Sequence, residues 1–116
     1  MSKVGFDLDG TVYAEPELWT QVARGLKDRG NTVGVLTARN PKAHKQLDML
    51  RLRDMGFPVD FYVGMDADDP ARGESHREWK LSQMRRLAID YLFDDFDTGV
   101  VQLVCHTGYA THGNPY

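Results

Sequence analysis

The sequence predicts an α/β fold, in which a mainly parallel β-sheet lies between layers of helices as a three-layer sandwich. Three observations predict it. Short apolar runs alternate with amphipathic stretches, helix-capping residues flank those stretches, and polar residues stand where the apolar runs end. The length of 116 residues is that of one compact domain, so we treat residues 1–116 as a single domain.

The first part of the chain predicts a strand, a helix and a second strand. The short run from Lys3 to Phe6 is typical of a strand and stops at Asp7. Apolar residues spaced by four then predict a helix from about Glu15 to Arg29. The run from Thr32 to Leu36 is rich in β-branched residues, which predicts the second strand.

The middle of the chain repeats this alternation. Asn40 before Pro41 is typical of an N-cap followed by proline at the first helical position, and the helix should run to about Met55. A third strand is expected over Val59 to Val63. The stretch from Gly64 to Gly73 is acidic, contains glycine and is expected to be a loop.

The last part predicts one more helix and strand before the pattern weakens. Ser75-His76-Arg77-Glu78 has the spacing of a capping box, so a helix should begin there and continue to about Leu87. A fourth strand is expected over Ile89 to Phe93. Beyond it we expect a short helix from Thr98 to His106 and an edge strand from Tyr109 to Thr111.

Composition excludes several classes of protein. The net charge of −3 argues against a broad nucleic-acid-binding surface, although a local basic groove remains compatible with it. The single cysteine, Cys105, cannot form an internal disulfide and is expected to be a small buried hydrophobe. No apolar run approaches the length of a membrane span or of a signal peptide core. We therefore expect a cytoplasmic protein without membrane contact.

Polar residues stand at the ends of three predicted strands. Asp7 ends the first, Thr37 the second and Asp94 the fourth, and parallel strands bring their carboxyl ends to one edge of the sheet, where ligands bind. With Asp9 and Asp95 this edge holds four carboxylates, which repel one another unless a cation lies among them. Mg²⁺ prefers such hard oxygen ligands, so we expect a magnesium site.

Four motifs resemble those of the haloacid dehalogenase superfamily of phosphotransferases. Phe6-Asp7-Leu8-Asp9-Gly10-Thr11 resembles the first motif and Val35-Leu36-Thr37 the second. Trp79-Lys80 resembles the third and Leu92-Phe93-Asp94-Asp95 the fourth, in the order of the family. The resemblance implies a Rossmann-like sheet, a Mg²⁺ cofactor, and hydrolysis of phosphomonoesters through an aspartyl-phosphate.

The resemblance also implies four catalytic residues. Asp7 attacks phosphorus and carries the phosphoryl group, while Asp9 gives a proton to the leaving oxygen and later takes one from water. Thr37 donates its hydroxyl to a phosphoryl oxygen, and Lys80 offsets negative charge. Three other cations remain alternative sources of that charge: Lys42, Arg72 and Arg77.

Binding residues follow from the same resemblance. The expected metal-site residues are Asp7, Asp9, Asp94 and Asp95. Asp9 would contribute its backbone carbonyl, and either Asp95 or Asp97 would hold a metal-bound water. Four residues just after the first and second strands are expected to bind the phosphorylated substrate: Gly10, Thr11, Ala38 and Arg39.

The spacing of the motifs leaves no room for an inserted cap domain. Capless members of the family resemble those that act on large substrates, such as phosphoproteins or nucleic-acid ends. Thr37-Ala38-Arg39 and His76, with Trp79-Lys80, resemble the 3′-phosphatase part of polynucleotide kinases. Arg39 would then bind a neighbouring phosphate. We therefore expect a large phosphorylated substrate such as a nucleic-acid 3′ end.

Other functions remain open at this point. A phosphatase of a small metabolite, a nucleotide or a phosphoprotein would use the same residues. A phospho-accepting module like a receiver domain also sets acids, a threonine and a lysine at strand ends, but there the acids precede the lysine. Here Asp94 and Asp95 follow Lys80, which disfavours that class. A non-catalytic phosphate-binding domain is the third alternative, and the oligomeric state is not predicted.

Overall fold

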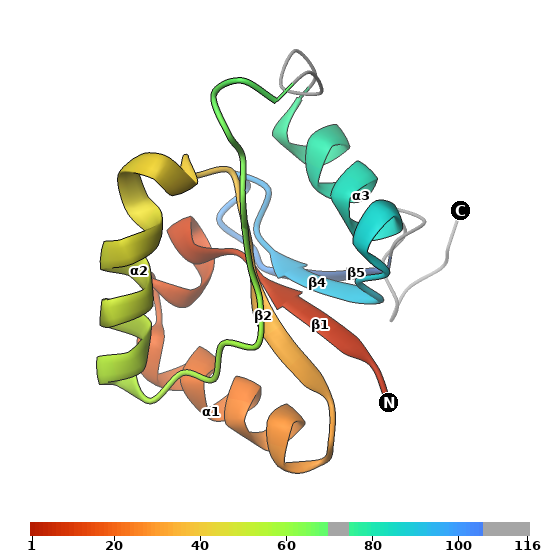
Figure 1. The fold of residues 1–116 in the computed structure, drawn as a ribbon. Helices are drawn as coiled ribbons and strands as arrows, with labels where there is room; N and C mark the ends of the chain where they lie inside the picture. Colours follow the sequence, from red (N-terminus) through yellow and green to blue (C-terminus); the bar gives the residue numbers. More distant parts are fainter. Residues whose placement is uncertain (70–74, 106–116) are drawn as a thin grey trace.

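A computed structural model describes residues 1–69 and 75–105, which form a five-stranded sheet in the order β3-β2-β1-β4-β5 (Figure 1). The strands are β1 (Lys3–Phe6), β2 (Thr32–Thr37), β3 (Tyr62–Gly64), β4 (Tyr91–Asp94) and β5 (Gln102–Cys105). β1 pairs in parallel with β2 and β4, and β2 pairs in parallel with β3. The α/β class and the mainly parallel sheet are thus as the sequence predicts.

Helices cover both faces of this sheet. The helical elements are η1 (Leu8–Val12), α1 (Pro16–Asp28), α2 (Pro41–Met55) and α3 (His76–Leu87). α1 and α2 contribute Ala23 and Leu52 to a core with the β1 residue Phe6. α3 contributes Trp79 and Met84 to a second core on the other face. This is the three-layer arrangement expected from alternating strands and helices.

The helix ends follow the capping residues in the sequence. The Asn40 side chain accepts a hydrogen bond from the Lys42 amide at 3.0 Å, and the Ser75 hydroxyl accepts one from the Glu78 amide at 3.2 Å. Each bond satisfies a backbone donor that the first turn of a helix leaves free. α2 ends at Gly56, which adopts the left-handed conformation (φ 80°) that glycine favours.

The chain changes direction across the sheet next to its central strand. From β1 it proceeds outward to β2 and β3, and α3 then carries it back across the sheet to β4 on the other side of β1. In open α/β sheets such a change of strand order leaves a crevice at the carboxyl ends of the two central strands. Here those ends carry Asp7, directly after β1, and Asp94, the last residue of β4.

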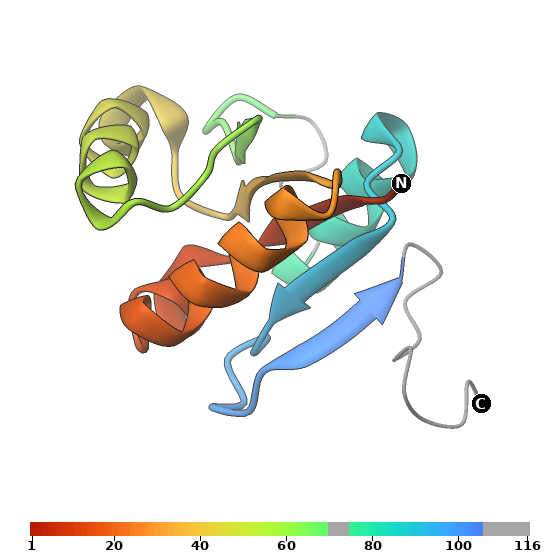
Figure 2. The same cartoon turned by 90° about the horizontal axis from the view of Figure 1, so that it is seen from below.

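The expected helix from Thr98 to His106 is wrong in its described part, because Gln102–Cys105 forms strand β5. β5 pairs antiparallel with β4, and the two arrows point in opposite directions in Figure 2. The stretch holds only a few apolar residues, for which helical and strand periodicity are indistinguishable, and the free edge of β4 decides the outcome. The predicted strand from Tyr109 to Thr111 lies outside the described residues.

Smaller shifts affect the third and fourth strands. β3 begins at Tyr62 and not Val59, although the preceding segment already bonds to β2: the Asp60 amide donates to the Val33 carbonyl at 2.7 Å, and the Asp60 carboxylate accepts from the Val33 amide at 3.0 Å. β4 begins at Tyr91 because Ala88 ends α3 in a left-handed conformation and Ile89 is buried in the second core.

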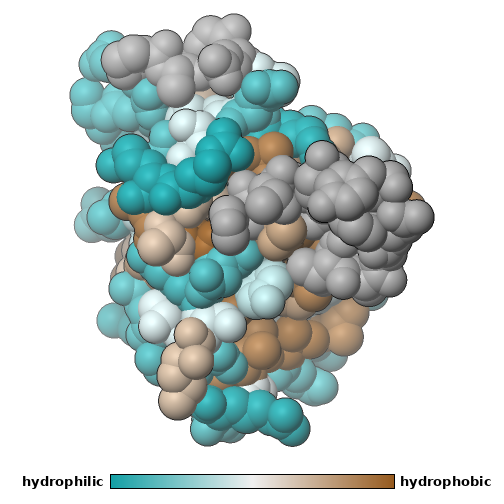
Figure 3. Space-filling view, turned by 90° about the vertical axis from the view of Figure 1, so that its right-hand side faces the viewer, coloured by the Kyte–Doolittle hydropathy of each residue, from teal (hydrophilic) through white to brown (hydrophobic). Residues whose placement is uncertain are grey.

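One side of the molecule shows an area of hydrophobic surface among hydrophilic surroundings (Figure 3). No helix among the described residues has the length and apolar character needed to cross a membrane.

Candidate active site

Strand register brings three predicted residues to one edge of the sheet. Phe6 lies opposite Val35 on one side and Phe93 on the other, so the carboxyl ends of the three strands meet at the same edge of the sheet. The Asp7 amide continues this ladder by donating to the Phe93 carbonyl at 2.9 Å. Asp7, Thr37 and Asp94 are all buried there, as expected from their positions at the strand ends.

An aromatic cluster supports the central strand beneath the site. The Phe6 ring stacks on Phe93 at 4.9 Å between centroids and meets Phe57 edge-on at 5.4 Å. Phe6 is fully buried and directly precedes Asp7, so this packing fixes the backbone from which the carboxylate projects.

Lys80 projects from α3 and contacts the buried carboxylates of Asp7 and Asp94. Its Nζ lies 3.1 Å from Asp7 Oδ1 and donates to Asp94 Oδ2 at 2.5 Å. Burial on its own would lower the pKa of Lys80, but the charges of Asp7 and Asp94 outweigh it and raise that pKa. Lys80 is therefore a buried cation that stays protonated between two acids.

Asp7 is only 5% exposed, and this burial affects the pKa of its carboxyl group. Burial is the largest influence and raises its pKa, Lys80 opposes that effect, and the nearby Asp94 raises the pKa further, to about 7. A buried carboxyl group whose pKa is raised by burial and by a neighbouring carboxylate is typical of functional sites.

Three carboxylates are arranged as a candidate metal site. Asp7, Asp94 and Asp95 are all buried, and one oxygen of each lies within 4.8 Å of the others. Three hard, anionic oxygen donors in one small volume fit Mg²⁺ or a similar divalent cation. The residues present therefore fit the expected cofactor, and the side chain of Asp9 is not part of this group.

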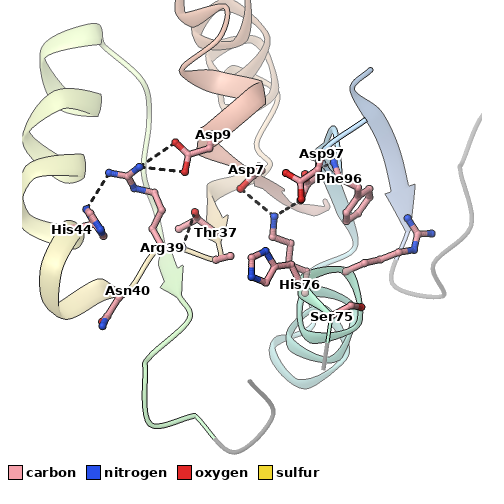
Figure 4. Close-up of a pocket in the computed structure, with 14 residues that line it drawn as sticks. Asp7, Asp9, Thr37, Arg39, Asn40, His44, Ser75, His76, Phe96 and Asp97 are labelled. Atoms are coloured by element: carbon pink, nitrogen blue, oxygen red, sulfur yellow. Dashed lines mark hydrogen bonds and ion pairs between the residues drawn. The ribbon is translucent and has the colours of Figure 1, made fainter. Parts of the chain in front are cut away.

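Asp9 instead forms an ion pair across the mouth of the crevice. Both of its carboxylate oxygens accept from Arg39 Nη1, at 3.0 and 3.2 Å, and its side chain is 66% exposed (Figure 4). The charges of Asp48 and Asp9 raise the pKa of Arg39 against the opposing effect of burial. Asp9, the predicted acid–base residue, thus lies beside the three-carboxylate group, and its side chain is bonded to Arg39.

Gly10 allows the first loop to approach the last acidic residue. It has φ 78°, and a Cβ at this position would lie 2.4 Å from Asp95 Oδ2. The loop conformation and this close approach both require glycine. Of the other predicted substrate-binding residues, Ala38 and Arg39 line the crevice, whereas the Thr11 side chain is fully buried.

The crevice is a pocket of about 690 Å³ above these residues. Its walls include several residues that the sequence did not single out as substrate-binding: Asn40, His44, Ser75, Phe96 and Asp97. Asn40 and Ser75 are the N-caps of α2 and α3, so the N-termini of both helices face the pocket (Figure 4). Helix N-termini attract anions. Asn40 and Ser75 could therefore have been predicted to lie near a bound anion from the capping pattern in the sequence.

The alternative cations are placed differently from Lys80. The Lys42 Nζ lies 3.7 Å from Asp66 and 3.5 Å from Asp68, on the acidic loop. Arg77 lines the pocket with its guanidinium over the Phe96 ring, 4.6 Å from the centroid. Arg72 lies outside the described residues.

Asp95 and Asp97, the two candidates for holding a metal-bound water, occupy different positions in the loop after β4. Asp95 belongs to the three-carboxylate group, whereas Asp97 lines the pocket and donates its amide to Asp95 Oδ1 at 3.3 Å. Phe96 and Asp97 both have positive φ, 48° and 63°, and the Phe96 amide bonds to Asp94 Oδ1 at 2.8 Å. Side chains of the acidic pair therefore hold a tight, strained turn.

Fold and site together define an α/β protein with a buried lysine and three buried carboxylates at the carboxyl edge of its sheet. No protein-family model matches the chain, and no curated protein or solved structure matches it significantly.

Proposed function

We propose that this chain is a magnesium-dependent phosphatase with a haloacid dehalogenase-like fold, which hydrolyses phosphomonoesters through an aspartyl-phosphate on Asp7. One observation carries the proposal. The Asp7 carboxylate opens into a pocket, lies 3.1 Å from a buried lysine, and shares a 4.8 Å volume with two other buried carboxylates. A nucleophile, a fixed cation and a metal-ligand set thus meet at one point.

In the proposed reaction a carboxylate oxygen of Asp7 attacks phosphorus, and the bond from phosphorus to the ester oxygen breaks. The Lys80 ammonium stays bonded to Asp7 and Asp94 and offsets the charge of the incoming phosphoryl group. Thr37 stands at the end of the neighbouring strand, where its hydroxyl can donate to a phosphoryl oxygen. Mg²⁺, when bound by Asp7, Asp94 and Asp95, would offset the repulsion between the nucleophile and the phosphate.

Asp9 supplies the proton transfers in this proposal. Its carboxylic acid protonates the leaving oxygen, and the resulting carboxylate then takes a proton from the water that attacks the aspartyl-phosphate. That water's oxygen bonds to phosphorus, and Asp7 leaves as a carboxylate. The side chain must turn from Arg39 toward Asp7 for these steps, and its 66% exposure leaves it room to do so.

A large phosphorylated substrate, such as a nucleic-acid 3′ end, fits the proposed site best. The pocket is open to solvent in the described residues, and cationic Arg39 and Arg77 line it together with two helix N-termini. These groups suit a substrate with negative charge beyond the phosphate that reacts. A small metabolite, a nucleotide and a phosphoprotein remain alternative substrates, and a non-catalytic phosphate-binding domain is the alternative function.

Phosphate release from 3′- and 5′-phosphorylated oligonucleotides, phosphopeptides and an aryl phosphate tests the proposal. Each is assayed with Mg²⁺, with chelator, and with the Asp7→Asn variant. We expect turnover that needs Mg²⁺ and disappears in Asp7→Asn, with the 3′-phosphorylated oligonucleotide preferred. A folded protein that releases phosphate from none of these substrates would refute catalysis, and phosphate binding without turnover would favour the binding domain.

A further inference from the structure

A buried carboxylate outside the pocket is bonded to one of the pocket's residues. Asp48 lies on α2, is 3% exposed, and does not line the pocket. Its Oδ2 accepts from Arg39 Nε at 3.0 Å and from the Tyr62 hydroxyl at 2.7 Å, and its Oδ1 accepts from the Tyr13 hydroxyl at 2.6 Å. A buried charge on a helix is costly unless it is bonded in this way.

The donors to Asp48 come from three separate parts of the fold. Tyr13 follows η1, Tyr62 begins β3, and Arg39 lies in the loop after β2. Burial and the hydrogen bonds to Asp48 raise the pKa of both tyrosines, so the phenols remain donors. Tyr13 also lies under the Arg39 guanidinium, with its ring centroid 5.6 Å from Cζ. Asp48 therefore restrains Arg39 by a hydrogen bond to its Nε, and Tyr13 places an aromatic ring beside the guanidinium.

The outer end of the same guanidinium is directed to the pocket. Nη1 bonds to both oxygens of the exposed Asp9 carboxylate, and Nη2 lies 3.1 Å from His44 Nδ1. Since Arg39 is anchored through Nε, its terminal nitrogens keep their place when the exposed Asp9 side chain turns away. An arginine held in this way presents a fixed pair of donors to a carboxylate or a phosphate.

We propose that Asp48 is a positioning residue, which together with Tyr13 and Tyr62 fixes Arg39 so that its terminal nitrogens bind an anionic group of the substrate beside the phosphoryl group that reacts. The inference rests on the proposed phosphatase function and adds the residues that position Arg39 for phosphomonoesters with a second anionic group close to the first. A phosphodiester next to a terminal phosphate has this chemistry.

The test compares two substrates in each variant, a 3′-phosphorylated oligonucleotide and an aryl phosphate that lacks a second anion. In Asp48→Asn we expect the ratio of the two kcat/KM values to fall about tenfold, mainly through KM for the oligonucleotide. In an Arg39→Lys background, Asp48→Asn should lower the ratio no further, because the guanidinium that Asp48 positions is absent. Asp60→Asn, which removes another carboxylate paired with a cation, is the matched control and should leave the ratio unchanged.

The ratio distinguishes positioning from a merely structural role. Loss of folded protein lowers both kcat/KM values equally, so an unchanged ratio in Asp48→Asn would overturn the proposal. A wild type with no preference for the oligonucleotide would overturn it as well. Tyr13→Phe and Tyr62→Phe each remove one bond to Asp48 and should lower the ratio by a smaller factor.

A second measurement does not depend on activity. The Arg39 Nε–H signal in a ¹H–¹⁵N spectrum should exchange with solvent more slowly than that of exposed Arg53, and should lose this protection in Asp48→Asn. If the wild type hydrolyses neither substrate, the phosphatase proposal fails while this result still judges the role of Asp48. Equal exchange at Arg39 and Arg53 would show that Asp48 does not fix the guanidinium.

Discussion

Replacing Asp7 with asparagine is expected to stabilise the metal-free protein at neutral pH, even though it removes the proposed nucleophile. Burial and Asp94 hold the Asp7 pKa near 7 against an ordinary value of 3.8. This difference corresponds to roughly 4 kcal/mol by which the fold disfavours the charged carboxylate. An asparagine carries no charge, and Lys80 keeps its bond to Asp94.

The sign of the pH dependence follows from the same pKa. Between pH 3.8 and about 7, folded Asp7 retains a proton that the unfolded chain has released. The wild type therefore loses stability as pH rises through this window, and the asparagine variant does not. Asparagine bonds to Lys80 less strongly than a carboxylate does, so we expect a net gain of about 1–3 kcal/mol above pH 7 and little difference below pH 4.

Urea unfolding at pH 4, 6 and 8 in chelator measures this gain. Asp54→Asn, at an exposed carboxylate on α2, is the control and should shift stability by less than about 0.5 kcal/mol. Mg²⁺ should then stabilise the wild type more than Asp7→Asn, because the variant lacks one proposed ligand. An Asp7→Asn variant that is less stable than the wild type at pH 8, or a gap independent of pH, would refute the electrostatic reasoning.

Three further perturbations test other parts of the structure. Lys80→Met leaves two buried carboxylates without their cation, so we expect a loss of about 3–5 kcal/mol in urea unfolding at pH 8 and no phosphate release; near-wild-type stability would contradict the pairing. Gly10→Ala forces a Cβ against Asp95, and calorimetric titration should show weaker Mg²⁺ binding with a loss of about 1–3 kcal/mol in stability. Asp60 has its pKa lowered by the hydrogen bond from Lys27 and by the Val33 amide, so its contribution is present above its ordinary pKa and lost as pH falls through the lowered one. Since that ion pair is largely exposed, Asp60→Asn should cost only about 0.5–1 kcal/mol at pH 7, and the difference should vanish in acid.

The strand-end residues could be predicted because they depend on a simple geometric rule. Apolar runs give the strands, a parallel sheet aligns their carboxyl ends, and the polar residue after each run must then lie at that edge. Asp7, Thr37 and Asp94 follow this rule in the structure. Ser75 and Asn40 were likewise recognisable as caps, since the pattern that sets a helix start is local.

The rest of the site depends on contacts that leave no local pattern. Asp48 and Asp54 are both acids within the same predicted helix, yet only Asp48 is buried, because Tyr13 and Tyr62 approach it from other elements. The orientation of Asp9 likewise depends on the position of Arg39, which Asp48 sets. Strand β5 depends on the open edge of β4, which a short apolar stretch in the sequence does not reveal.

The contact between Gly10 and Asp95 has a consequence for the order in which the protein matures. The proposed nucleophile follows β1, but its acidic neighbours Asp94 and Asp95 lie at and just after the end of β4, the last strand of the described residues that pairs in parallel. The bond from the Lys3 amide to the Asp90 carboxylate, at 2.8 Å, spans 87 residues, so β4 can pair with β1 only after all the residues between them have been synthesised. A nascent chain that has built β1, β2 and β3 therefore holds an incomplete site. Metal binding and reactivity at Asp7 should appear only once β4 inserts beside β1, so acquisition of Mg²⁺ affinity by truncated chains would report completion of the sheet.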